Sequence, residues 1–160
     1  MSNQPEITPD SLIAILDNVK AEFGAVIDQL DVNSPMPSIG EWNARQVLSH
    51  VIGSLNHTPI QAGYFLAGAP SVPVIFSDPY WISAWHDAPI QAFKAAFEAA
   101  IEGNKGLVRS LPADALWRVL PVNGFGEMPL SAFLIVSYNG HVKGQHLHQL
   151  RAFNEVKQPA

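Results

Sequence analysis

The sequence contains no cysteine. This absence excludes disulfides, cysteine-ligated zinc, iron–sulfur clusters and a thiol nucleophile supplied by the protein. A metal bound to this chain would have histidine, carboxylate or water as its ligands. A thiol that took part in a reaction would arrive with a cofactor.

Charge is also scarce, because only 14% of the 160 residues are Asp, Glu, Lys or Arg, and the formal net charge is −5. The nine lysines and arginines are scattered, so no basic stripe is present to neutralise nucleic-acid phosphates or anionic lipid headgroups. We therefore expect no nucleic-acid partner and no membrane partner. The low charge also leaves apolar surface that suits an oligomer interface.

Long hydrophobic runs are missing as well: no stretch approaches the roughly 18 apolar residues that span a bilayer. The first ten residues lack the basic segment and following apolar segment of a secretory signal. We expect a cytoplasmic protein. The length suits a single domain over residues 1–160.

Several stretches have the spacing of amphipathic helices. Thr8 and Pro9 form a helix start, and apolar residues then recur every three or four positions to Leu30. Asn43 is the expected cap of a second helix, with Gln46 at the capping-box position. Proline at the Thr58-Pro59 step predicts a kink or a restart in this helix, which is expected to end near Ala67.

The second half of the chain predicts two more helices. Asp87 and Pro89 open the third and Pro112 ends it, while the last begins at Pro129 and runs to about Glu155. The segments 117–120 and 125–128 flank Asn-Gly and predict a small hairpin. A long aromatic loop over residues 68–88 connects the second and third helices. The pattern predicts an all-α fold, a four-helix bundle.

Five of the six histidines fall on two of these helices: His50 and His57, then His141, His146 and His148. Helical bundles build metal sites from side chains on facing helices. In a regular helix His141 and His146 point about 140° apart. A π-bulge would bring residues five apart to one face, and nearby glycines make this segment deformable. Alternatively, His146 is a core histidine with its hydrogen bonds satisfied, and the other two are solvated.

Two of these segments resemble the DinB-like superfamily. The stretch Gly-Glu-Trp-Asn-Ala-Arg-Gln-Val-Leu-Ser-His-Val at 40–51 resembles the family's capped second helix, and His50 matches its metal ligand. His-Leu-His-Gln-Leu at 146–150 resembles the end of its last helix. The family has a further histidine four residues earlier, where this chain has Val142, with His141 beside it. A competing register places Tyr138 and Val142 at both ligand positions and leaves no metal site.

The resemblance implies an up-down-down-up bundle, often dimeric, with a divalent metal, and its known activities include thiol-dependent transferases. We expect zinc or nickel at His50, His146 and His141, a small-molecule substrate, and a homodimer. The expected activity is that of a metal-dependent hydrolase or of a transferase that uses a low-molecular-weight thiol. The alternative is a non-catalytic, ligand-binding dimeric bundle with a degenerate metal site. A third hypothesis is a protective protein that binds or hydrolyses a reactive metabolite.

Overall fold

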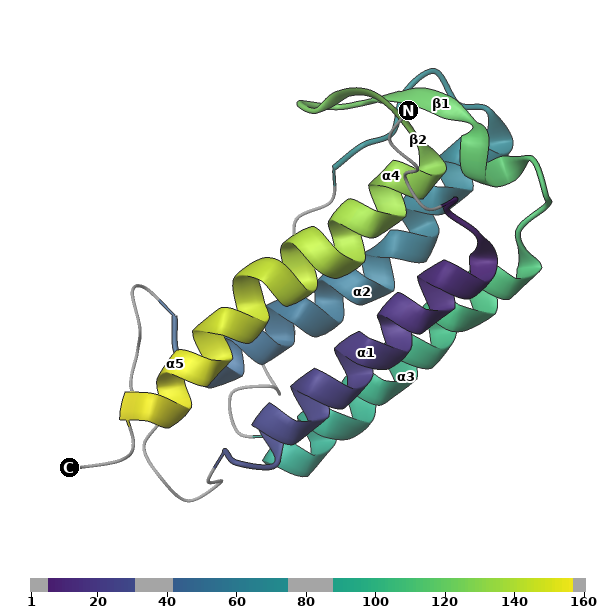
Figure 1. Cartoon of the computed structure of the whole chain (residues 1–160). Coiled ribbons are helices and arrows are strands. Elements are labelled where there is room, and N and C mark those ends of the chain that lie inside the picture. Colours follow the sequence, from purple (N-terminus) through teal and green to yellow (C-terminus); the bar gives the residue numbers. More distant parts are fainter. Residues whose placement is uncertain (1–5, 31–41, 75–87, 157–160) are drawn as a thin grey trace, which may run out of the picture.

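The computed structural model describes residues 6–30, 42–74 and 88–156, and these residues form a four-helix bundle (Figure 1). The first three helices are α1 (Pro9–Ile27), α2 (Ala44–Ala67) and α3 (Ile90–Ser110). The fourth is one helical run made of α4 (Leu130–Ile135), the π-helical segment η3 (Val136–Leu147) and α5 (His148–Val156). A short 3₁₀ turn, η2 (Ala115–Trp117), and the strands β1 (Val119–Val122) and β2 (Gly126–Pro129) connect α3 to α4. The predicted fold class is confirmed.

Helices α1 and α2 begin where side-chain capping predicts. The Thr8 hydroxyl accepts a hydrogen bond from the Ser11 amide, and the Ser11 hydroxyl accepts one from the Thr8 amide. Asn43 and Gln46 form the same reciprocal pair at the start of α2. Each pair satisfies amide groups that the first helical turn leaves without a partner. Gly68, in the left-handed region at φ 62°, ends α2 at the predicted place.

The helices are arranged up-down-down-up. Asp17 pairs with Lys105, and Asp28 pairs with Lys94, so α1 and α3 run antiparallel. Both α1 and α2 pack against α3 and against the last helical run, which places α1 and α2 diagonally across the bundle. Figure 1 shows α2 and α3 running in one direction and α1 and the last run in the other. This order brings α2 directly beside α4 and η3.

Apolar side chains from all four helices meet along the bundle axis. The predicted stripe of α1 is buried, and the Phe23 ring stacks on Phe97 of α3 at 5.0 Å between centroids. Phe65 of α2 and Phe133 of α4 pack at 5.5 Å. Of the helices within the described residues, none is both long and apolar enough to cross a bilayer.

Of the two outcomes predicted at Pro59, the restart is wrong, since α2 continues through the proline, and the kink stays a prediction. Pro59 has no N–H, so it cannot donate to the carbonyl of Leu55 one turn earlier. The side chain of Asn104, on α3, replaces that donor: its Nδ2 lies 2.8 Å from the Leu55 oxygen. The same amide group accepts, through Oδ1, a 2.8 Å hydrogen bond from the buried hydroxyl of Tyr138. A tertiary contact thus repairs the helix.

The predicted hairpin is present, with each strand beginning one or two residues later than expected. Gly124 and Gly126 adopt φ of 81° and 80°, which suits glycine at the turn and at the start of β2. Two backbone hydrogen bonds join Val72, just after α2, to the hairpin strand β1 and the residue after it. This contact holds the hairpin over the ends of α2 and α4. Most of the predicted aromatic loop, residues 75–87, lies outside the described residues.

Candidate metal centre

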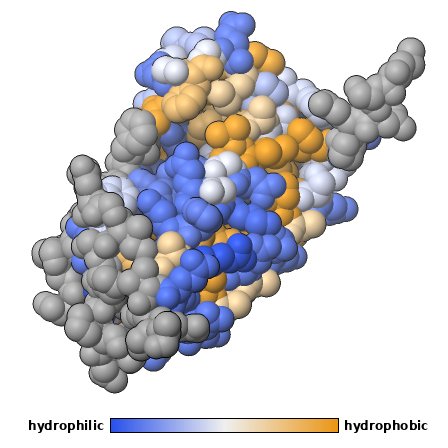
Figure 2. Space-filling model, turned by 60° about the vertical axis from the view of Figure 1, so that its left-hand side comes forward, coloured by the Kyte–Doolittle hydropathy of each residue, from blue (hydrophilic) through white to orange (hydrophobic). Residues whose placement is uncertain are grey.

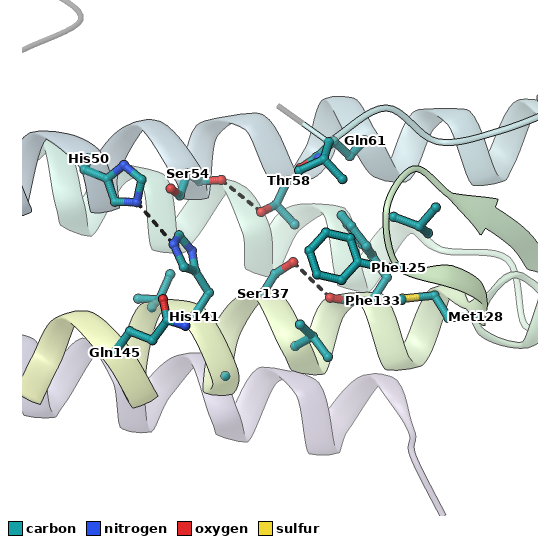
Figure 3. Close-up of a pocket in the computed structure, with 15 residues that line it drawn as sticks. His50, Ser54, Thr58, Gln61, Phe125, Met128, Phe133, Ser137, His141 and Gln145 are labelled. Carbon is teal, nitrogen blue, oxygen red and sulfur yellow. Dashed lines mark hydrogen bonds between the residues drawn. The ribbon is translucent and has the colours of Figure 1, made fainter. Parts of the chain in front are cut away.

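Three histidines, one from α2 and two from η3, bring their side chains together inside the bundle. His141 Nε2 lies 3.1 Å from His50 Nε2 and 3.0 Å from His146 Nε2. One ring nitrogen from each of the three lies within 4.8 Å of the others. His50 and His146 are each 6% exposed, and His141 is half-buried. Figure 3 shows His50 and His141 pointing toward one another from facing helices.

The π-helical geometry of η3 is what aligns His141 with His146. In a π-helix the backbone hydrogen bonds join residues five positions apart, so each turn holds more residues than in an α-helix, and the side chains of His141 and His146 come to neighbouring positions. The structure thus has π-helical geometry at this pair, as a shared site for His141 and His146 requires. The π-helical segment extends over 12 residues rather than a single turn. Val142 is buried and lines the neighbouring cavity, and Tyr138 bonds to Asn104. The residues at the ligand positions of the competing register, Tyr138 and Val142, therefore lie in the core, and the histidine cluster is formed by His50, His141 and His146.

Gly144 suits this segment because the backbone passes close to its Cα. A Cβ built at Gly144 would lie 3.1 Å from the carbonyl oxygen of Asn139, five residues earlier. A Cβ at Gly140 would meet nothing closer than 3.8 Å, an ordinary contact. Of these two glycines, Gly144 is therefore the one where a side chain would crowd the π-helical backbone.

Gln149 and Trp42 fix the orientation of the cluster. The His146 Nδ1–H donates to Gln149 Oε1 at 2.7 Å, which leaves the lone pair of His146 on Nε2, the atom that faces His141. The indole of Trp42 lies nearly parallel to the His146 ring, with an interplanar angle of 14° and 6.3 Å between ring centroids. Its centroid lies 4.9 Å from that of the His50 ring. The cluster is therefore covered by an aromatic ring and held in one tautomer at His146.

Burial keeps the imidazoles of His141 and His146 neutral. Burial, together with the neighbouring His146 and His50, lowers the pKa of His141 to about 4. Burial also lowers the pKa of His146 to about 4, although the hydrogen bond with Gln149 acts in the opposite direction. Neutral imidazole is the form that binds metals.

The donor set fits a divalent cation. A neutral imidazole carries one N–H, so hydrogen bonds alone cannot satisfy both short contacts at His141 Nε2 together with the lone pair of His146. A cation satisfies all three lone pairs at once. Two nitrogens at about 2.0–2.1 Å from one metal, at tetrahedral or octahedral angles, are roughly 2.9–3.4 Å apart. The observed separations of 3.0 and 3.1 Å lie in that range.

A cavity of about 340 Å³ begins at the histidines and continues between α2 and the last helical run. His50 and His141 line one part of it, and Phe125 and Met128 of the hairpin region line another (Figure 3). An open side of the histidine cluster thus faces a space of the size that binds small molecules.

Some of the cavity residues were not predicted from the sequence. Ser54, Thr58 and Gln61 line one wall from α2, and Ser137 lines the opposite wall. Their spacing of four and three residues from His50 and from one another places the α2 residues on one helix face, which is a signal that the sequence contains. The other two histidines on these helices, His57 and His148, do not join the cluster.

Comparisons with known proteins give a similar fold. No family model matches the chain, and no curated protein matches it. One solved structure, YfiT from Bacillus subtilis, is similar with a TM-score of 0.63 and 20% sequence identity, over 95% of this chain and 92% of that chain. YfiT is described as a probable metal-dependent hydrolase with an unusual four-helix bundle topology. The chain therefore has the fold of this four-helix bundle.

Proposed function

We propose that this chain is a metal-dependent enzyme that hydrolyses a small molecule, with a divalent metal held by His50, His141 and His146. The observation that carries the proposal is the convergence of three imidazole nitrogens beside a cavity, with His141 Nε2 at 3.0 Å from His146 Nε2 and 3.1 Å from His50 Nε2, and all three within 4.8 Å of one another. The described function of YfiT, a probable metal-dependent hydrolase, supports the same reaction class. A divalent metal with three histidine ligands and open positions supplies a Lewis acid that activates water.

The chain's own residues have separable roles in this proposal. His50, from the α-helix α2, and the two η3 histidines provide the ligand nitrogens. Gln149 keeps the His146 lone pair on Nε2. Trp42 covers one side of the cluster, and the cavity on another side admits the substrate. Zinc and nickel both suit imidazole ligands.

The experiment is a hydrolysis screen on the metal-free protein before and after it is loaded with zinc or nickel. We expect turnover of at least one neutral ester or amide, dependent on the metal and lost in His50→Ala. His57→Ala is the matched control, because His57 lies on the same helix outside the cluster, and it should retain activity. Equal turnover in wild type and His50→Ala would contradict the proposal.

The thiol-dependent transferase stays a prediction, since no described side chain identifies a thiol-binding group. Adding a low-molecular-weight thiol and an electrophile to the same screen would test it. The homodimer also stays a prediction, tested by measuring the mass of the protein in solution.

A further inference from the structure

The cavity beside the histidines has two chemically different ends. His50 and His141 lie at one end, and the hairpin lies over the other (Figure 3). A molecule that fills it therefore extends along the bundle axis, away from the histidines. A volume of about 340 Å³ is at the lower end of the range for drug-sized ligands.

The hairpin end is apolar. The side chains that form it come from the hairpin, from α4 and η3, and from the segment after α2: Val74, Val122, Phe125, Met128, Phe133 and Val136. Phe125 and Val136 are also 60% and 50% exposed, so the cavity opens to solvent through an apolar rim. Figure 2 shows hydrophobic surface gathered toward the upper part of the molecule, with a hydrophilic area below it.

Full charges are missing from this lining. Among the described residues that line the cavity, none is Asp, Glu, Lys or Arg. A carboxylate or ammonium group moved into the apolar end would lose its hydration without gaining an ionic partner there. The cavity therefore favours a neutral tail.

Polar groups midway along the cavity present acceptors. The Thr58 hydroxyl donates to the Ser54 carbonyl at 3.0 Å, and the Ser137 hydroxyl donates to the Phe133 carbonyl at 2.9 Å. Each hydroxyl proton is thus directed to the backbone, and the oxygen lone pairs are left to accept a hydrogen bond. The two residues lie on opposite walls, on α2 and η3.

From this arrangement we infer the substrate class: a neutral, elongated molecule with its reactive group at the histidines, an N–H or O–H in the middle, and an apolar tail under the hairpin. That this ligand is a substrate rests on the proposed function. The recognition itself depends only on side chains of this chain, so it can be measured without metal and without turnover.

The test uses neutral secondary amides as probes of metal-free protein, with dissociation constants from calorimetry. N-hexylacetamide should bind roughly fiftyfold more tightly than N-propylacetamide, because it buries three more methylenes at about 0.8 kcal/mol each. Hexylammonium, with the same tail and a charge, should bind at least tenfold more weakly than N-hexylacetamide. N-hexyl-N-methylacetamide, which lacks the N–H, should also bind several-fold more weakly than N-hexylacetamide.

Val136→Asp places a charge on the apolar rim at a half-exposed position, and it should remove most of the gain from the longer tail. Val119→Asp is the matched control, because Val119 is 54% exposed and does not line the cavity. A flat series across tail lengths in wild type, or equal binding of hexylammonium, would overturn the inference. So would an unchanged gain in a folded Val136→Asp variant.

A parallel zinc titration separates the two proposals. If zinc binds with one ion per chain and the amide series is flat, the substrate class is wrong and the metal-dependent function stands. If the amides bind as expected and zinc does not, the cavity recognises this ligand class and the metal-dependent function is wrong.

Discussion

The two helices that supply histidines differ in where their backbones depart from α-helical geometry. Helix α2 contains a proline and yet continues as an α-helix, and Asn104 donates to the carbonyl that Pro59 leaves without a partner. The last helical run contains no proline after Pro129, and yet it departs from α-helical geometry for 12 residues, where two histidines five apart must share a face. The departure from α-helical geometry therefore does not coincide with the helix-breaking proline. It coincides with the segment that contains the two histidines in contact.

The largest effect is expected from moving a ligand along the π-helical segment. His141→Ala should lower zinc affinity by far more than the roughly 10–100-fold that loss of an outer-shell partner costs. Adding Val142→His should restore little of that loss, because Val142 packs in the hydrophobic core, whereas the ring of residue 141 is the one that reaches both other histidines. Zinc affinity is measured by competition with a chromogenic chelator. Full recovery in the double variant would mean that the last helix has a regular α-helical register.

In contact with α2, the hydrogen bonds of Asn104 should contribute substantially to the free energy of unfolding. Asn104→Ala leaves the Leu55 carbonyl and the buried Tyr138 hydroxyl without their hydrogen bonds, and it should cost about 2–4 kcal/mol in the free energy of unfolding. The measurement is urea denaturation of the metal-free protein.

Pro59→Ala sharpens this test as a double-mutant cycle. Alanine at 59 has an N–H that can donate to the Leu55 carbonyl, so Asn104→Ala should cost about 1–2 kcal/mol less in that background. Equal costs in both backgrounds would show that Asn104 does not compensate for the proline.

The pH dependence of stability should depend on the η3 histidines. Burial lowers the pKa of both His141 and His146 to about 4, below the value of about 6.5 expected in the unfolded chain. The unfolded state therefore binds more protons in this interval, so their contribution to stability is full above pH 6.5 and falls as the pH approaches 4. The metal-free protein should lose about 2 kcal/mol from each of these two histidines between pH 7.5 and pH 5. His146→Gln should lose clearly less, and identical pH profiles would contradict the assignment.

The smallest expected effect is at the glycines of η3. Gly144→Ala brings a Cβ to 3.1 Å from the Asn139 carbonyl, so we expect a shift in the π-helical backbone and a several-fold loss of zinc affinity. Gly140→Ala meets only an ordinary contact and should leave that affinity unchanged, with a stability gain of up to about 1 kcal/mol. Equal zinc affinities in the two variants would show that Gly144 is not needed for the π-helical geometry.

Much of the fold follows from local signals. The caps at Thr8 and Asn43, the end of α2 at Gly68 and the hairpin turn each depend on residues within a few positions of one another, so the sequence predicts them. The continuity of α2 through Pro59 depends on a side chain 45 positions away, and no local pattern indicates it.

The candidate site was predictable only in part, namely where it depends on the spacing of residues along a helix. The pairing of His50 with the last helix follows from bundle geometry, and the five-residue spacing of His141 and His146 identifies a π-helical turn as the condition for a shared site. The extent of η3 and the contact between Gly144 and Asn139 depend on the packed backbone. The acceptor groups of Thr58 and Ser137 are set by their hydrogen bonds to the backbone, which the sequence does not specify.

The most direct measurement is the metal content of the purified protein after loading with zinc, for wild type and five single alanine variants of the histidines on these helices. We expect one zinc per chain in wild type, in His57→Ala and in His148→Ala, and substantially less than one in His50→Ala, His141→Ala and His146→Ala. One zinc per chain in any of the last three, with an unchanged affinity, would contradict the three-histidine centre. So would the absence of bound zinc and nickel in the folded wild-type protein.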